Sequence, residues 1–166
     1  MPQRDDAAAL IRTLTDRDLT IATAESLTGG LLAAALVDVP GASVVFRGGI
    51  VAYATPVKST LLGVDRDLLA ERGPVDPEVA RQMADGVRRA CAVDGRPTDL
   101  GIATTGVAGP DSQDGHPPGT VYIGVAMGDD VQSTTLELAG DRAEIRSATV
   151  SAAIDAALAR LKADRQ

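Results

Sequence analysis

Hydrophobic residues along this chain follow two spacings. In some segments they recur three and four positions apart, as on one face of an α-helix, and in others they form short uninterrupted runs, as in a strand buried on both faces. The helical spacing covers residues 7–14, 79–91 and 150–161. The uninterrupted runs predict strands at residues 20–24, 49–53 and 100–104.

Capping and turn residues mark where these elements begin and end. Asp65 and Asp76 stand where helix N-caps are expected, because each precedes a segment with helical spacing or good helix formers. Gly128 lies between two apolar segments, residues 121–127 and 131–138, which we expect to pair as a β-hairpin.

Helices and strands alternate early in the chain, and the hairpin comes late. Early alternation is typical of α/β proteins, in which helices cover both faces of a sheet. We predict one domain over residues 1–166, a three-layer α/β/α sandwich whose mixed, mostly parallel sheet has about five strands. The helix over residues 31–37 is apolar all round, which predicts that most of its sides are covered.

Composition narrows the classes of partner. A net charge of −7 and an aromatic content of 2% provide neither the basic surface nor the stacking residues of a nucleic-acid-binding protein. No apolar run approaches the ~20 residues of a membrane helix, and the first residues form no apolar leader. Cys91 is the single cysteine, and its spacing predicts a buried helical thiol. We expect no nucleic-acid or membrane partner and a cytoplasmic location.

Residues 23–30 carry the strongest functional signal. They join a predicted strand to a predicted helix, so Ser26 lies in the turn between them. A serine in such a turn can attack a carbonyl while backbone N–H groups, here those of Thr28, Gly29 and Gly30, hold the oxyanion. The same N–H groups could bind a phosphate instead, and Ser26 could simply cap the helix.

A serine nucleophile needs a base. Tyr53 ends the second predicted strand and Lys58 follows five residues later, so both can reach Ser26 if the first two strands are neighbours. A lysine acts as a base when desolvation or a nearby cation lowers its pKa from about 10.4, and a tyrosine hydroxyl can relay the proton. The alternatives are a solvated lysine and a core tyrosine. His116, the only histidine, lies in a Gly- and Pro-rich segment and is a weaker candidate.

A second glycine-rich turn follows the strand over residues 100–104. Ligands of open α/β sheets bind beyond the carboxyl ends of strands, where glycines let backbone amides approach a phosphate or ribose. Thr105, Gly106 and Gly109 begin this loop, which extends to residue 119 and is long for a compact domain. Arg142 is a candidate for a bidentate phosphate contact. A plain turn and a surface arginine are the alternatives.

The sequence favours neither a metal ion nor a cofactor. One histidine and one cysteine, with no carboxylates at matching spacing, do not make a zinc site. The Gly-x-x-x-x-Gly-Lys-Ser/Thr motif is absent, and the glycine pair at residues 29–30 is not a dinucleotide fingerprint.

Several motifs, in order along the chain, resemble one known family. Residues 24–30, Ala-Glu-Ser-Leu-Thr-Gly-Gly, are similar to the Ala-Glu-Ser-Cys-Thr-Gly-Gly signature of the CinA carboxy-terminal domain, also described as the PncC-type nicotinamide-nucleotide amidases. The resemblance runs from residue 10 to residue 161. It includes Gly-Gly-x-Val-x-Tyr at 48–53, Thr-Gly-Val-Ala-Gly-Pro at 105–110 and Gly-Asp-Arg at 140–142.

This resemblance implies deamidation of a small pyridine nucleotide, nicotinamide mononucleotide, to nicotinate mononucleotide and ammonia. The family is described as using a serine nucleophile with a lysine and a tyrosine, which fall on Ser26, Lys58 and Tyr53. The resemblance also implies a homodimer or a higher homo-oligomer. The chain resembles the stand-alone form of the domain.

Three departures from the family pattern matter. Leu27 replaces a cysteine and Asp76 replaces a serine, and we expect these changes to affect packing and helix capping but not the chemistry. The loop over residues 111–117 is less glycine-rich and lacks the family's lysine before the proline. This difference bears on substrate affinity or choice more than on reaction type.

The leading hypothesis is therefore an amidohydrolase with an acyl-serine intermediate. In it Lys58, assisted by Tyr53, takes the proton of Ser26, and the amides of residues 28–30 hold the oxyanion. The loop of residues 106–109 and Arg142 hold ribose and phosphate. Two alternatives stay open: a non-catalytic nucleotide-binding module that is regulatory in competence or DNA-damage responses, and an amidase for another pyridine or amide substrate.

Overall fold

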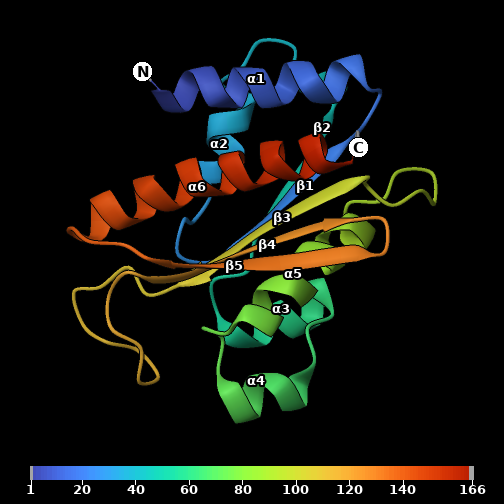
Figure 1. Cartoon of the computed structure of the whole chain (residues 1–166). Coiled ribbons are helices and arrows are strands. Elements are labelled where there is room, and N and C mark those ends of the chain that lie inside the picture. The colour runs from blue at the N-terminus through green and yellow to red at the C-terminus, as the bar shows by residue number, and fades with distance from the viewer. Residues whose placement is uncertain (1, 165–166) are drawn as a thin grey trace.

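The computed structural model describes residues 2–164, and a five-stranded sheet forms its middle layer (Figure 1). Two of the strands pair in parallel with a central one, and the remaining two form the predicted hairpin. The strands, in chain order, are β1 (Ile21–Glu25), β2 (Phe46–Val51), β3 (Leu100–Gly106), β4 (Thr120–Met127) and β5 (Asp130–Glu137).

The order across the sheet is β2-β1-β3-β4-β5. Strand β1 is parallel to β2 and β3, whereas β4 is antiparallel to both β3 and β5, so every strand except β4 runs in the same direction. The predicted mixed, mostly parallel sheet is confirmed. The carboxyl ends of β1, β2 and β3 consequently meet at one edge.

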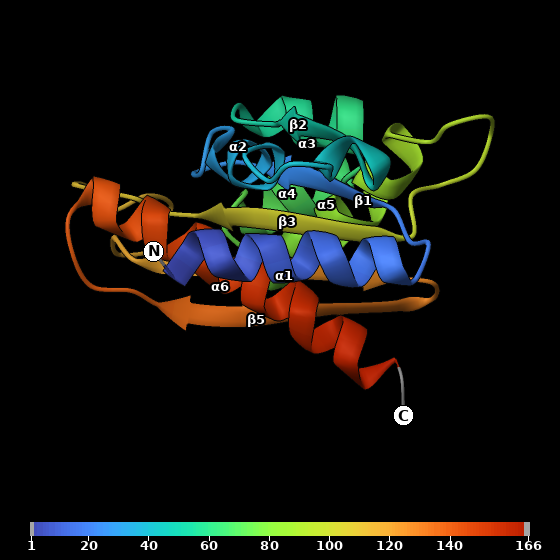
Figure 2. The ribbon, with the colours of Figure 1, turned by 90° about the horizontal axis from the view of Figure 1, so that it is seen from above.

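Helices cover both faces of the sheet, as predicted for a three-layer sandwich (Figure 1). The upper layer contains α1 (Pro2–Asp16), α2 (Leu31–Val37) and α6 (Arg142–Ala163). The lower layer contains α3 (Thr55–Leu62), α4 (Arg66–Arg72) and α5 (Pro77–Ala90). Figure 2 shows α1 and α6 crossing on the upper face, where they contact each other.

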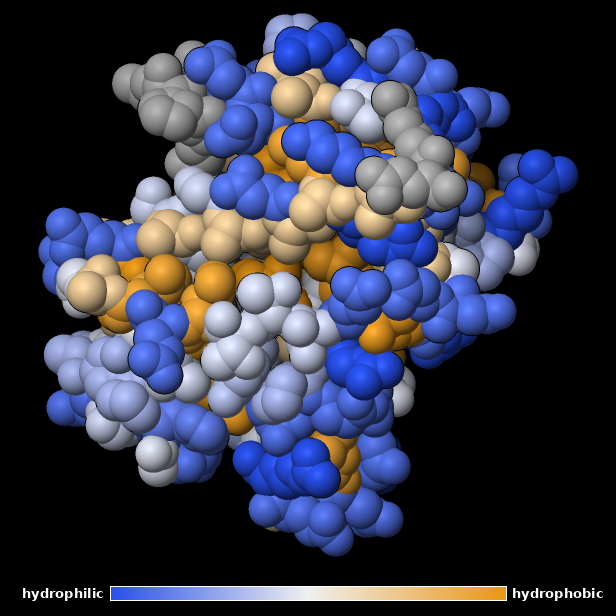
Figure 3. All heavy atoms as spheres, viewed as in Figure 1, coloured by the Kyte–Doolittle hydropathy of each residue, from blue (hydrophilic) through white to orange (hydrophobic). Residues whose placement is uncertain are grey.

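Two apolar clusters hold the layers together, one on each face of the sheet. In the upper cluster Leu10 and Leu14 of α1 pack with Ile154 of α6, and in the lower cluster Val79 and Met83 of α5 pack beneath the sheet. These side chains are those that the helical spacing predicts. Apolar residues also reach the surface as a band between the upper helices and the lower part of the molecule (Figure 3).

The structure corrects three local expectations. Strand β2 spans residues 46–51 instead of 49–53, so Tyr53 lies beyond its end. Helix α2 is not covered on most sides, because it lies near the edge strand β2 and leaves Leu31 and Val37 39% and 60% exposed. Cys91 is only partly buried, because α5 ends at Ala90 and Cys91 caps it.

Helix α5 approaches the sheet closely where the strands carry glycine. A Cβ on Gly101 of β3 would lie 2.0 Å from the carbonyl oxygen of Ala84, and one on Gly124 of β4 would lie 2.0 Å from that of Ala80. Neither backbone oxygen can move without shifting the helix, so glycine sets the spacing between α5 and the sheet.

We expect Gly101→Ala to lower the free energy of unfolding by about 2–3 kcal/mol, because the added methyl group forces α5 away from β3. Gly48→Ala is the matched control: its Cβ would meet only the Cys91 Sγ, at 3.3 Å, so a change below about 1 kcal/mol is expected. Urea denaturation measures both values. Equal losses would contradict the role assigned to Gly101.

Candidate active site

A cavity opens at the sheet edge where β1, β2 and β3 end. Its walls come from the turn after β1, the segment joining β2 to α3, the turn before α5, the loop after β3 and the start of α6. Seven of the ten site residues expected from the sequence line it: Ser26, Tyr53, Lys58, Thr105, Gly106, Gly109 and Arg142. Thr28, Gly29 and Gly30 do not.

A serine–lysine pair lies in this cavity. The amine of Lys58 donates to the Ser26 Oγ at 3.0 Å and to the backbone oxygen of Ala52 at 2.7 Å. Both side chains are buried, with Lys58 only 1% exposed. The expected convergence of Ser26 and Lys58 from two segments is thus seen in the structure.

The local fold explains how Lys58 reaches the serine. Pairing of β2 with β1 continues one residue past the strand, through a 2.8 Å bond from the Ala52 amide to the Glu25 oxygen. Pro56 then opens α3, and Lys58 lies in its first turn and a half, directed back toward the sheet. One backbone segment therefore provides both the amine and the carbonyl that orients it.

Burial makes Lys58 a candidate base. No ion pair among the described side chains includes it. Desolvation therefore acts unopposed and lowers the pKa of Lys58 from 10.5 to about 8. The neutral amine is then populated close to neutral pH, and its lone pair can accept the serine proton across the same contact.

The carboxylate of Glu25 occupies the start of α2. It accepts the amides of Gly30 and Leu32 at 2.9 and 3.0 Å, and that of Ala33 at 2.8 Å. The Gly29 amide donates to the backbone carbonyl oxygen of Ser26 at 3.1 Å. The expectation that Gly29 and Gly30 hold an oxyanion is corrected, because both amides are already bonded. A phosphate at this helix end is equally disfavoured, because a carboxylate is there.

Other amides are left free beside Ser26. Those of Leu27 and Thr28 donate to no acceptor among the described residues, and neither do those of Ala108 and Gly109 across the cavity. Leu27, Ala108 and Gly109 line the cavity, whereas Thr28 does not. The amide that follows a nucleophile in a strand-to-helix turn is a common oxyanion donor. The amides of Leu27, Ala108 and Gly109 are thus available to a ligand in the cavity.

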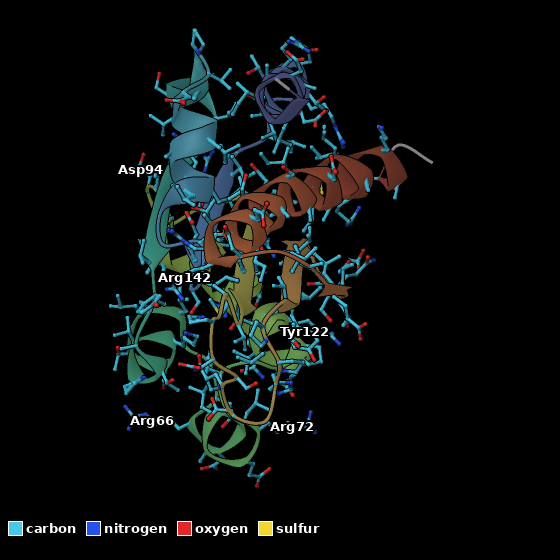
Figure 4. The ribbon with its side chains drawn as sticks, turned by 90° about the vertical axis from the view of Figure 1, so that its left-hand side faces the viewer. Arg66, Arg72, Asp94, Tyr122 and Arg142 are labelled. Atoms are coloured by element: carbon cyan, nitrogen blue, oxygen red, sulfur yellow. The ribbon has the colours of Figure 1, made fainter. Side chains whose placement is uncertain are left out.

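Tyr53 lies at the rim and not at the serine. Its hydroxyl accepts from Arg142 Nη2 at 3.1 Å, and Nη1 of Arg142 donates to the Gly109 oxygen at 2.7 Å. Tyr53 is 61% exposed and has no hydrogen bond to Ser26 or Lys58. Figure 4 shows Arg142 at the start of α6, with Arg66 and Arg72 on α4 in the lower layer.

The remaining candidates have structural contacts. The Thr28 hydroxyl lies 2.8 Å from that of Thr104, and the Thr105 hydroxyl donates to the Pro74 oxygen at 2.6 Å. His116 bridges to Gln113 within the loop after β3, outside the cavity, and so is not placed to act as a base for Ser26.

Sequence reasoning missed several residues of the site. Pro74 and Val75 form a wall because the turn before α5 bonds to the end of β3, a contact that no sequence pattern announces. A sequence feature could have identified Glu25: it is the one carboxylate in an otherwise uncharged strand, and a buried acid needs a hydrogen-bonding partner. The spacing could also have identified Arg146, because it follows Arg142 by one helical turn and so lies on the same face of the helix.

Among the described side chains no group of three or more His, Cys, Asp or Glu residues could hold a metal ion. Within the same part of the chain, no helix combines the length and the apolar character that crossing a bilayer requires.

Comparison with known proteins identifies similar chains. The sequence model of the CinA C-terminal domain matches residues 4–161. A CinA-like protein of Frankia casuarinae is 51% identical over 142 residues, covering 86% of this chain and 32% of that protein. A putative competence-damage inducible protein of Geobacillus kaustophilus is 50% identical over 137 residues, covering 82% and 32%. The chain thus spans about a third of the length of these curated relatives.

Solved structures show the same fold. A CinA superfamily protein from Klebsiella pneumoniae superposes with a TM-score of 0.90 at 27% identity, covering 96% of this chain and 98% of that one. The competence/damage inducible protein CihA from Agrobacterium tumefaciens superposes with a TM-score of 0.89 at 32% identity, covering 98% and 96%.

We expect Glu25→Ala to lower the free energy of unfolding by at least about 3 kcal/mol, because it leaves three amides at the start of α2 without an acceptor. Asp65→Ala is the control, since Asp65 caps α4 through two amides at an exposed site and should cost about 1 kcal/mol. Urea denaturation compares them, with Glu25→Gln as a milder variant. A loss at Glu25 no larger than that at Asp65 would refute its role as a buried cap.

Proposed function

This chain belongs to the CinA C-terminal domain family, and from that membership and the Ser26–Lys58 contact we propose that it is an amidohydrolase acting on nicotinamide mononucleotide. The observation that carries the proposal is the 3.0 Å contact between a serine hydroxyl and a buried lysine amine that has no acidic partner among the described residues. That pair supports amide hydrolysis, and the resemblance to the nicotinamide-nucleotide amidases supplies the substrate.

In the proposed reaction neutral Lys58 accepts the Ser26 proton while Oγ attacks the carboxamide carbon. The oxyanion forms between the Leu27 amide and the amides of residues 108–109. The Lys58 ammonium then protonates the leaving nitrogen, the C–N bond breaks, and ammonia departs from an acyl-serine. Lys58 next takes a proton from water, whose oxygen attacks the ester carbon. Nicotinate mononucleotide leaves as Ser26 regains its proton.

The walls of the cavity support this substrate. Leu27, Val75 and Val107 line the cavity together with Ser26, but each is nearly fully buried and the accessible lining is mostly polar, which suits a polar, nucleotide-like ligand. At the rim Arg142 uses two of its donors on Tyr53 and Gly109 and keeps others for a phosphate. We therefore assign Tyr53 to the rim with Arg142, in place of the proton relay expected from the sequence.

A non-catalytic nucleotide-binding module is the second candidate, because the relatives are named competence-damage inducible proteins, after a response and not after a reaction. Such a module would bind nicotinamide mononucleotide without releasing ammonia. A third candidate, an amidase for another amide, would release ammonia faster from a different member of an amide panel assayed with and without the phosphate.

Ser26→Ala and Lys58→Met should each lower the rate of ammonia release from nicotinamide mononucleotide by at least about 10³-fold, because each removes one member of a cooperating pair. Lys162→Met is the matched control: Lys162 lies in the last turn of α6, away from the cavity, and its loss should leave the rate unchanged. Binding calorimetry on Ser26→Ala should still detect the substrate. Release at the parent rate by Ser26→Ala would exclude Ser26 as the nucleophile.

The pH dependence should follow Lys58. Because only the neutral amine accepts a proton and burial lowers the pKa of Lys58 to about 8, log(kcat/KM) should rise with unit slope below that pH and level off above it. A kcat/KM that stays constant between about pH 6.5 and 9 would be incompatible with Lys58 as the base.

The lowered pKa of Lys58 can also be tested through the pH dependence of the free energy of unfolding. Between about 8 and 10.5 the unfolded chain retains a proton that folded Lys58 has released, so the free energy of unfolding should increase with pH across this window. Lys58→Met should remove that increase. Chemical denaturation at several pH values measures it without reference to activity.

A further inference from the structure

A second arginine of α6 reaches the turn that carries Ser26. Arg146 Nε donates to the Leu27 oxygen at 2.9 Å, and its Nη2 donates to the Thr28 oxygen at 3.0 Å. The side chain is half-buried, and no ion pair among the described side chains includes it. Two consecutive carbonyls of one turn are thus its hydrogen-bond partners.

An arginine in this position acts on backbone orientation. A guanidinium is planar and presents its donors in a fixed fork, so binding two carbonyls at once restricts both peptide planes. The Arg146 Nη2 lies against Gly29, where a Cβ would be 3.4 Å from it, an ordinary contact distance. Gly29 and Gly30 both have positive φ, at 58° and 100°, so the chain after the turn has little intrinsic restraint of its own.

The orientation of these peptides decides which amides face the cavity. Ser26 to Gly29 form a turn closed by the Gly29 amide on the Ser26 oxygen. Because the N–H and C=O of a trans peptide point in opposite directions, this bond directs the Leu27 amide out of the turn. The hydrogen bonds from Arg146 fix the carbonyls of Leu27 and Thr28, which are the next two along the chain. They thereby restrict rotation of the peptide planes that follow the Leu27 amide.

We propose that Arg146 is a positioning residue for the amide hydrolysis proposed above, holding the Ser26 turn so that the Leu27 amide stays directed at the oxyanion. The proposal rests on that function. Arg146 does not line the cavity, so it acts through the turn and not on the substrate. Arg142, one turn earlier, contacts the opposite rim, and a single helix thereby fixes both sides of the site.

The test compares Arg146→Lys and Arg146→Ala with the parent protein in steady-state ammonia release from nicotinamide mononucleotide. Misplacing one oxyanion donor should lower kcat by about 10–100-fold and change KM by less than about 3-fold. Millimolar guanidinium chloride should restore part of kcat in Arg146→Ala, because the free ion can occupy the vacated position, and should not raise kcat of the parent. Arg146→Lys, which keeps the charge without the fork, should also lose kcat.

Arg160→Ala is the matched control, because Arg160 lies on the same helix, pairs with Asp130 and Asp164, and is remote from the cavity. It should lower the melting temperature without lowering kcat. Thermal unfolding of every variant separates loss of fold from loss of positioning, and Arg146→Lys serves if Arg146→Ala does not fold.

Three results would overturn the proposal. Parent-level kcat in a folded Arg146→Lys or Arg146→Ala variant would show that the turn holds without the guanidinium. A loss confined to KM that vanishes with nicotinamide riboside, which lacks the phosphate, would make Arg146 a phosphate ligand. If the parent protein releases no ammonia, both the proposed amidohydrolase function and the positioning role are rejected. If the parent is active and the Arg146 variants are unaffected, only the positioning role is rejected.

Discussion

The site depends on one contact, between a serine hydroxyl and a lysine amine that the fold removes from water and that has no counter-ion in residues 2–164. Burial of an amine costs free energy. Lys58 is nevertheless buried, because the ends of three strands, α3 and the turn before α5 enclose its amine. The Ala52 oxygen is the second partner that keeps the amine aimed. The lowered pKa of Lys58 is thus a consequence of the packing around it.

Two sets of contacts surround the Ser26–Lys58 pair, one next to the serine and one at the rim of the cavity. Backbone groups close to the serine are fixed from within the domain: Glu25 holds the start of α2, and Arg146 holds the turn before it. At the rim, Arg142 contacts Tyr53 and the backbone oxygen of Gly109. Helix α6 therefore contacts both the Ser26 turn and the rim of the cavity, whereas Glu25 holds the start of α2 independently of that helix.

The sequence was sufficient for the layers, the hairpin and the Ser26–Lys58 convergence, because these follow from hydrophobic spacing and from parallel neighbours ending at one edge. It was insufficient for contacts that depend on side-chain reach. Tyr53 was expected at the serine from its chemistry, yet β2 ends at Val51 and leaves Tyr53 at the rim. Gly29 and Gly30 were expected to donate because glycines often do, yet the long side chain of Glu25 folds back onto the helix start.

Glu25 has a consequence for the direction in which a ligand enters. A helix start normally attracts anions, but here the carboxylate has neutralised that attraction from inside the protein. An anionic group that enters the cavity therefore gains nothing from the start of α2, whereas Arg142 at the rim still has donors free for it, so the rim is where the fold favours the anionic end of a ligand.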